Sequence, residues 1–233
     1  IIQATELLRS GAADVVITGG TESSLTRLGI AAFCRMGAMA TKYNDDPQRA
    51  IRPFDANRSG LVMSEGAGIL VLESEESVAR RGAVPLAEVL GYGSTSDACH
   101  LVRPEPSGQG AAQAIRQAIG SAGLEVARIA SRTYINAHGT GTKANDVAET
   151  LALKEAFGGL TQQLKVSSTK SMTGHMIGAA GAVEAVACVR TLRTGIVPPT
   201  INLETPDPEC DLNIVAGSAQ QADIHYAINN TFG

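Results

Sequence analysis

The chain has 233 residues, enough for one large domain or two moderate ones, and 44% of them are hydrophobic while 18% are charged. A net charge of −4 without a basic block and an aromatic content of 3% argue against nucleic acid as a partner. No apolar run approaches the roughly 20 residues of a membrane-spanning helix. Four scattered cysteines without a CxxC pair indicate a reducing compartment and no disulfide framework.

The first part of the chain alternates helical and strand patterns around one long polar loop. The patterns predict a helix over 1–10, a buried strand over 14–18, a helix or buried loop over 29–40, a long loop over 42–60, a buried strand over 66–73 and a helix over 75–81. Gly11 and Gly82 close two of these helices. The order of strand and helix restarts near Ala83, which divides the chain into parts 1–83 and 84–233.

The second part continues the alternation. It contains a predicted strand over 86–92, a loop over 93–110, a helix over 111–122, a strand ending at 136, a helix ended by Gly158, a strand over 164–168 and a helix ended by Gly195. Asp146 and Glu149 have the spacing of a capping box for the helix before Gly158. This order predicts an α/β protein with mixed, mostly parallel sheets covered by helices.

Both ends of the chain look cut. The first residue is Ile1 rather than Met, and a helical face begins there without a capping residue. The last ten residues have the pattern of a strand that runs into a loop. We therefore expect a fragment of a longer protein, in which no targeting peptide is visible.

Two histidines follow apolar runs in similar polar turns. His138 stands in the turn after the strand ending at 136, and His175 stands in the turn after the strand at 164–168. Ligands of open α/β sheets bind outside the carboxyl ends of strands, so the two histidines are predicted to form one site. Each could instead be a structural hydrogen-bond donor. The spacing does not match HExxH or a similar zinc motif, so no metal site is predicted.

Four further polar residues lie near the histidines in sequence. Lys170 could be a solvated loop lysine or a cation that fixes a hydrogen-bond network, and Glu184 interrupts a helix of small apolar residues. A buried carboxylate requires a partner, for which Lys170 is the first choice. Thr140 and Thr142 could donate hydrogen bonds to a polar ligand or could be ordinary turn hydroxyls.

No cysteine in the chain stands in a turn suited to an activated nucleophile. Cys188 has the surroundings of a core residue, and Cys34, Cys99 and Cys210 are interpreted as incidental. The glycine-rich turns contain neither GxxxxGK[ST] nor a GxGxxG that follows a strand, so no nucleotide site is predicted.

Several separate motifs together resemble one enzyme family. They are NAHGTGT at 136–142, STKSMTGH at 168–175, GAAG at 178–181, RPFD at 52–55, GAG at 66–68, PPTIN at 198–202 and NTFG at 230–233. Through them nearly the whole chain resembles the β-ketoacyl-acyl carrier protein synthases, most strongly the synthase II type of bacterial and organellar fatty acid synthesis. The resemblance implies the thiolase fold, with two similar halves in five αβαβα layers, usually as a cytoplasmic or organellar homodimer.

The resemblance also implies a mechanism and residue roles. A cysteine takes an acyl chain from acyl carrier protein, malonyl carrier protein is decarboxylated, and the resulting carbanion attacks the thioester. The catalytic residues implied are His138 and His175, supported by Lys170 and Glu184. The residues implied to bind substrate are Thr140 and Thr142 on the phosphopantetheine arm, Phe33 near the acyl pocket, and Phe232 with Gly233 in a gating loop. The arm arrives on the carrier, so no separate cofactor is expected.

The sequence departs from the family pattern at three points. The nucleophilic cysteine is expected just upstream of Ile1, and the gating loop is cut after Gly233. Gly37 stands where many members carry a carrier-docking arginine, which Arg35 or Lys42 could replace. Two alternative functions are a thiolase-type acyltransferase that uses free coenzyme A and a catalytically inactive partner subunit of a condensing-enzyme dimer.

Overall fold

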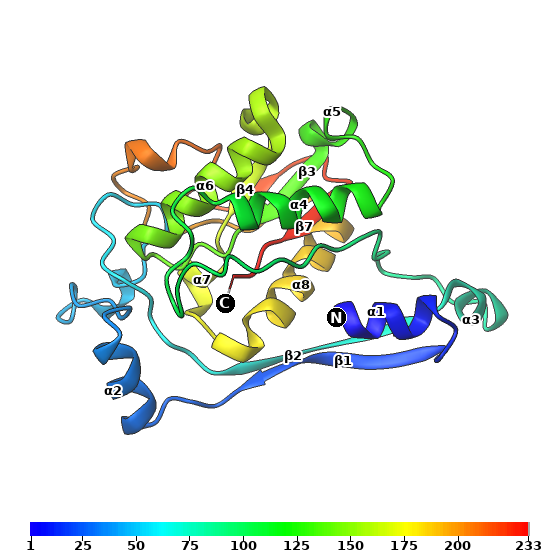
Figure 1. Cartoon of the computed structure of the whole chain (residues 1–233), viewed down its shortest axis with the longest axis horizontal. Helices are drawn as coiled ribbons and strands as arrows, with labels where there is room; N and C mark the ends of the chain where they lie inside the picture. Colours follow the sequence, from blue (N-terminus) through cyan, green and yellow to red (C-terminus); the bar gives the residue numbers. More distant parts are fainter. Residues whose placement is uncertain (233) are drawn as a thin grey trace.

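The computed structural model describes residues 1–232, so the gating-loop role predicted for Gly233 lies outside the described residues. Its helices, labelled in Figure 1, are α1 (Ile2–Arg9), α2 (Arg27–Arg35), α3 (Glu75–Arg80), α4 (Gln109–Ser121), α5 (Val126–Ile129), α6 (Lys143–Phe157), α7 (Lys170–Thr173) and α8 (Ile177–Thr194). Its strands are β1 (Val15–Glu22), β2 (Gly66–Glu73), β3 (Thr133–Asn136), β4 (Lys165–Ser167), β5 (Ile196–Val197), β6 (Gln220–Gln221) and β7 (Tyr226–Asn229). Single 3-10 segments occupy Pro47–Arg49, Ala130–Arg132, Gly158–Gln163 and Pro208–Cys210.

The strands that precede the two histidine turns lie side by side in a parallel sheet of order β4-β3-β7. In its register, Asn136 of β3 lies opposite Ser167 of β4 and Asn229 of β7. Because the three strands run in the same direction, the segments that follow them meet at one edge. The β1–β2 and β5–β6 pairs are antiparallel, so the sheets are mixed, as the sequence predicts.

Helix α8 forms a middle layer between the β1–β2 pair and the parallel sheet (Figure 1). Glycines permit this close packing. A Cβ atom added to Gly20 would lie 2.4 Å from the carbonyl oxygen of Gly178, and one added to Gly68 would lie 2.6 Å from the backbone nitrogen of Val183. The glycines of the β1–β2 pair therefore allow this approach, and on α8 a Cβ atom added to Gly178 would lie 3.4 Å from Thr21 O, so the small residue predicted there also lies close to the strand backbone.

Helices α4 and α6 pack against each other and share a core with the parallel sheet. Apolar side chains from both helices and from β3 and β4 fill this core: Ile115, Ile119, Leu153, Phe157, Ile135 and Val166. Residues 1–232 thus contain four layers in the order β1–β2, α8 with α1, the parallel sheet, and α4 with α6. No helix within this described part is both long and apolar enough to cross a membrane.

Most predicted helices are confirmed, with physical reasons for their ends. The helices expected at 1–10, 75–81 and 111–122 correspond to α1, α3 and α4. The helix after His175 ends at Gly195, whose φ of +70° favours glycine. The predicted long loop over 42–60 contains only the 3-10 turn Pro47–Arg49.

The prediction of buried strands over 14–18 and 66–73 is wrong in the degree of burial. The strands exist as β1 and β2, but they form a two-stranded antiparallel ribbon with one face open. Side chains on the open face include Ile17, which is 74% exposed, and Val71, which is 63% exposed. Their apolar composition is typical of a covered sheet, yet only the inner face packs against α1 and α8.

Two further sequence predictions are wrong. Residues 86–92 are not a strand: backbone pairing with a neighbouring strand is not formed there, and Leu86 is 63% exposed. The capping box at Asp146 and Glu149 is also wrong, because Thr142 is the N-cap of α6 and its hydroxyl accepts a hydrogen bond from Asn145 N. The two carboxylates lie inside the helix and bind the backbone of other segments.

Candidate active site

The structure brings the two histidines together. His138 follows β3, and His175 is held by backbone hydrogen bonds in which its N–H donates to Val62 O at 2.7 Å and its carbonyl accepts from Ser64 N at 3.0 Å. The centroids of the two imidazole rings are 5.3 Å apart, and the ring planes meet at 86°. Both side chains are nearly buried, with exposed fractions of 5% and 9%. Two turns that are distant in sequence therefore form one cluster.

A buried ion pair lies behind the histidines. The ammonium of Lys170 donates to a carboxylate oxygen of Glu184, and both side chains are almost completely buried. The Lys170 Nζ atom also lies 3.3 Å from Nδ1 of His138. The predicted contact between Lys170 and Glu184 is therefore present, and it places a charged group against the first histidine. Lys170 begins the short helix α7 rather than lying in an open turn.

The partners of the Nδ1 atoms determine the tautomers of both rings. Nδ1 of His138 faces the Lys170 ammonium, which can only donate, so this nitrogen accepts. Nδ1 of His175 accepts from the backbone N–H of Ile177 at 3.1 Å. In each neutral ring the proton therefore resides on Nε2. The site presents two imidazole N–H donors with fixed orientations.

Burial keeps both rings neutral at neutral pH. Desolvation, reinforced by the positive charge of Lys170 and by His175, holds the pKa of His138 well below its usual range. Desolvation and then the charge of Lys170 lower the pKa of His175 to about 4. Each ring is therefore a neutral hydrogen-bond donor rather than a proton source.

The carboxylate of Glu149 anchors the His138 turn. Its two oxygens accept from the backbone N–H groups of His138 and Gly139, each at 2.7 Å, and Asn230 Nδ2 donates to it at 3.3 Å. Burial raises the pKa of Glu149 to about 7, although the two backbone hydrogen bonds oppose that rise. Sequence reasoning missed this role. Asp146 and Glu149 lie on one face of α6, but only the folded chain shows that this face is buried against other segments.

The two threonines form a hydrogen-bonded pair beside the histidine turn. Their hydroxyl oxygens are 2.9 Å apart, and the backbone N–H of Thr142 donates to Thr140 Oγ1 at 3.3 Å. One hydroxyl proton is used within the pair, so one remains available to donate to another group. Thr140 is buried and Thr142 is half-buried, so the pair lies at the boundary between the core and the surface.

The two predicted substrate-binding phenylalanines are placed differently. The ring of Phe232 lies 5.3 Å from that of His138, at an interplanar angle of 57°. Phe33 is half-buried on α2, which extends to one side of the molecule in Figure 1. Within residues 1–232, no described interaction joins Phe33 to the histidine cluster. Phe232 is therefore part of the cluster, and the place predicted for Phe33 near the acyl pocket stays a prediction.

The cysteines of the chain do not have the surroundings of an activated thiolate. Burial raises the pKa of Cys188, and it raises the pKa of Cys210 to about 11. Cys210 belongs to the main apolar core, which corrects its interpretation as incidental. Cys34 and Cys99 are exposed.

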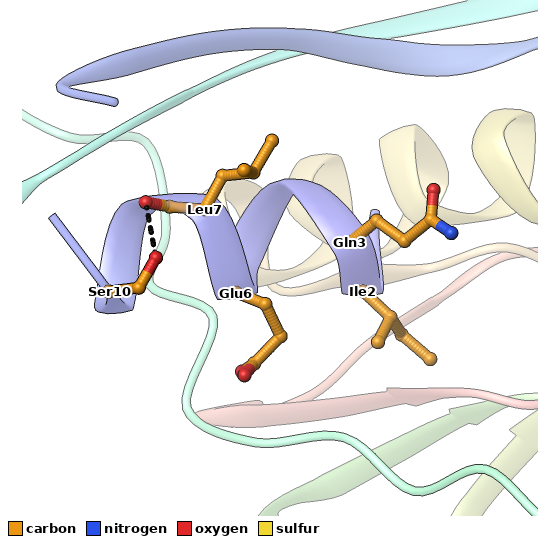
Figure 2. Close-up of a pocket in the computed structure, with 5 residues that line it drawn as sticks. All are labelled: Ile2, Gln3, Glu6, Leu7 and Ser10. Atoms are coloured by element: carbon orange, nitrogen blue, oxygen red, sulfur yellow. Dashed lines mark hydrogen bonds between the residues drawn. The ribbon is translucent and has the colours of Figure 1, made fainter. Parts of the chain in front are cut away.

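A hollow on α1 lies apart from this chemistry. Figure 2 shows its lining residues, which come from α1 and its C-cap residue: Ile2, Gln3, Glu6, Leu7 and Ser10. The one hydrogen bond drawn there is local, from the Ser10 hydroxyl to Leu7 O at 3.2 Å. All of these residues are contiguous with one helix, and we assign no function to this feature.

Comparison with known proteins identifies the class to which this fold and site belong. Residues 1–77 match the family described as beta-ketoacyl synthase, N-terminal domain, and residues 86–204 match beta-ketoacyl synthase, C-terminal domain. The chain belongs to the β-ketoacyl synthase family. The predicted division near Ala83 stays a prediction.

Several curated relatives are 3-oxoacyl-[acyl-carrier-protein] synthases 2. The chain is 48% identical to 3-oxoacyl-[acyl-carrier-protein] synthase 2 of Staphylococcus aureus strain COL over 231 residues, which cover 99% of this chain and 55% of that protein. It is 49% identical to the protein of the same name from Synechocystis over 230 residues, which cover 99% of this chain and 54% of that protein. The chain therefore spans about half the length of these relatives.

Solved structures show the same fold. A beta-ketoacyl synthase from Burkholderia phymatum matches with a TM-score of 0.91 and 38% identity, over 99% of this chain and 54% of that one. A type II PKS acyl-carrier protein in complex with its ketosynthase bound to the hexaketide matches with a TM-score of 0.93 and 37% identity, over 97% of this chain and 55% of that one. The thiolase-like layered architecture predicted from the sequence is confirmed.

Proposed function

We propose that this chain is part of an enzyme of fatty acid elongation that condenses malonyl-acyl carrier protein, with loss of CO2, with an acyl chain bound to the enzyme. The observation that carries the proposal is the pair of neutral imidazoles, whose ring centroids are 5.3 Å apart and whose Nε2–H groups make no hydrogen bond within residues 1–232. Decarboxylation of a malonyl thioester creates an enolate oxygen. Donors oriented before the charge develops stabilise it with little reorganisation.

In the proposed reaction, a cysteine upstream of Ile1 attacks the acyl thioester and releases the carrier thiol. The malonyl thioester then loses CO2, and the electrons of the broken C–C bond move onto the enolate. His138 and His175 donate their Nε2 protons in hydrogen bonds to this oxygen without transferring them. The enolate carbon attacks the acyl-cysteine thioester, which forms the new C–C bond and expels the cysteine thiolate.

Lys170 and Glu184 support the pair in this proposal. The Lys170 ammonium holds Nδ1 of His138 as an acceptor, so it selects the tautomer that places the proton on Nε2. Its positive charge also disfavours an imidazolium form of either ring. Glu184 balances that charge inside the core, where an uncompensated ammonium would be costly.

The substrates and partners of the whole enzyme are further parts of the proposal. We propose that Thr140 and Thr142 bind the phosphopantetheine arm of acyl carrier protein and that Phe232 and Gly233 gate the site, with Phe33 near the acyl pocket. The arm is carried by the partner, so no separate cofactor or metal is needed. A structural neighbour is a ketosynthase in complex with its acyl-carrier protein, which supports a carrier as the partner. We propose a homodimer in the cytoplasm or an organelle.

The test is malonyl decarboxylation by the complete synthase, measured as CO2 release from labelled malonyl carrier protein. We expect His138→Ala and His175→Ala each to reduce this rate by about 100-fold or more, as removal of an oxyanion donor does. Acyl transfer to the cysteine should be partly retained. His225→Ala is the matched control, because His225 is half-exposed and contacts Asp223. Unchanged decarboxylation in either site variant would refute the proposed roles.

The residue at the nucleophile position upstream of Ile1 separates the alternatives. A cysteine there supports the condensing enzyme, and its replacement by Gln or another residue supports a catalytically inactive partner. A thiolase-type enzyme would use a His/Cys pair, whereas this site contains two histidines.

A further inference from the structure

Arg58 is a buried arginine that connects three segments around the threonine turn. Its guanidinium donates to three carbonyl oxygens: Nη1 to Asp55 O at 2.9 Å, Nη2 to Lys143 O at 3.2 Å and Nε to Thr142 O at 3.3 Å. It also pairs with the carboxylates of Asp146 and Asp207. The side chain is only 1% exposed, so these contacts are made away from solvent.

The turn from Thr140 to Thr142 is held by Arg58 and its neighbours. Gly141 N donates to Asp146 Oδ1 at 3.2 Å, and Gly141 O accepts from Gly60 N at 3.0 Å. Thr142 O accepts from Arg58. The backbone positions that set the direction of both threonine hydroxyls are therefore fixed by the 58–60 loop and by Asp146, which itself pairs with Arg58.

The distribution of donors shows that Arg58 does more than neutralise charge. An ion pair would require only the contacts with the two carboxylates, yet Nε and Nη2 also point at the carbonyls of Thr142 and Lys143. A planar guanidinium can make these contacts simultaneously because its five N–H groups have fixed directions. A lysine has the same charge but a flexible point donor, so it cannot hold all of these acceptors at once.

We propose that Arg58 is a positioning residue that sets the Thr140–Thr142 hydroxyl pair for binding the carrier-borne arm. This inference rests on the proposed function. In the folded chain, Arg58 fixes the carbonyl of Thr142 and, through Asp146, the amide of Gly141. The oxygens of the two hydroxyl groups are then held in fixed positions, from which one proton can be donated to the arm.

The experiment compares two substrates of the complete synthase, because an arm-binding defect affects only one of them. Malonyl carrier protein carries the whole phosphopantetheine arm, whereas the malonyl thioester of ethanethiol has no arm. We expect Arg58→Lys to lower kcat/KM for decarboxylation of malonyl carrier protein by about 3- to 10-fold through KM, the loss of roughly one hydrogen bond. The kcat/KM for the ethyl thioester should stay unchanged.

Arg52→Lys is the matched control. Arg52 is also a 1% exposed arginine of the same loop, and it pairs with Asp55 and Glu204 instead of the threonine turn. We expect it to lower the melting temperature about as much as Arg58→Lys but to leave the ratio of the two kcat/KM values unchanged. Asp207→Asn serves as a milder second variant, because Asp207 orients Nη1 of Arg58 from the rim of the core.

Each outcome of this experiment either supports or overturns the positioning role of Arg58. Selective loss with the carrier substrate in Arg58→Lys, or in Asp207→Asn if the first variant does not fold, supports it. Equal losses with both substrates, or no loss, would show a purely structural role and overturn it. If the unmodified synthase does not decarboxylate malonyl carrier protein, the proposed function itself fails, which is a distinguishable result.

Discussion

The carboxyl group of Glu149 makes a quantitative prediction about the pH dependence of stability. It is fully buried and accepts from two backbone N–H groups of the His138 turn. Burial raises its pKa from 4.5 to about 7, so between these pH values the folded state binds its proton more tightly than the unfolded state does. The free energy of unfolding therefore falls as the pH rises through this window, by about 3 kcal/mol in total for this group.

Glu149→Gln should remove that pH dependence. Glutamine cannot ionise, but its side chain has only one oxygen for the two backbone N–H donors. Its amide nitrogen therefore faces one of these donors and cannot accept a hydrogen bond from it. This leaves one N–H unsatisfied, at a cost of about 1–3 kcal/mol that does not change with pH. The free energy of unfolding of the unmodified protein minus that of the variant should therefore decrease by about 3 kcal/mol between pH 4.5 and pH 8.

The assay is urea-induced unfolding of the complete synthase and its variants at a series of pH values, followed by circular dichroism. The matched control is Glu76→Gln, because the side chain of Glu76 is 86% exposed on α3 and forms an ion pair with Arg80 on the same helix. The control should follow the unmodified protein at every pH. A difference between Glu149→Gln and the unmodified protein that stays constant from pH 4.5 to pH 8 would refute the reasoning.

Two further predictions concern the histidine pair and the middle layer. Because the pKa of His175 is about 4, malonyl decarboxylation should be independent of imidazole protonation from pH 8 to about 5 and should fall about tenfold per pH unit below 4, as measured in a pH–rate profile. A fall of the rate centred near pH 6.5 in this profile would contradict the burial of the two imidazole rings. Gly68→Ala would place a Cβ atom 2.6 Å from the backbone of α8 and should destabilise the synthase by about 1–3 kcal/mol in urea. Its control, Gly120→Ala, meets open space in α4 and should stabilise by up to about 1 kcal/mol, so equal effects of the two would contradict the close packing.

The local elements of this chain could be predicted from its sequence, because their causes are local. Apolar spacing and closing glycines were sufficient for α1, α3, α4 and α8. The strand-turn pattern before His138 and His175 also predicted that both turns lie at one edge of a sheet. This prediction is correct because β3 and β4 are neighbouring parallel strands in the sheet of order β4-β3-β7. The motifs were specific enough to indicate the family, which the comparisons confirm.

Contacts between distant segments could not be predicted from the sequence in the same way. Glu149 and Asp146 have capping-box spacing, but the folded chain places backbone N–H groups of other segments against them. The pattern at 86–92 is that of a strand, yet a strand also requires a partner with free hydrogen-bonding groups. Local spacing does not specify which distant group will be adjacent.

The sequence by itself determined the alternation of strands and helices, the turns that carry His138 and His175, and the small residues that let α8 pack closely. Only the tertiary structure decided the tautomers, the low pKa values of the two rings and the role of Arg58 in holding the threonine turn. The physical reason is that these properties depend on burial and on charges and donors from segments far apart in the chain. Such groups become neighbours only when α8, the parallel sheet and the 52–60 loop pack together.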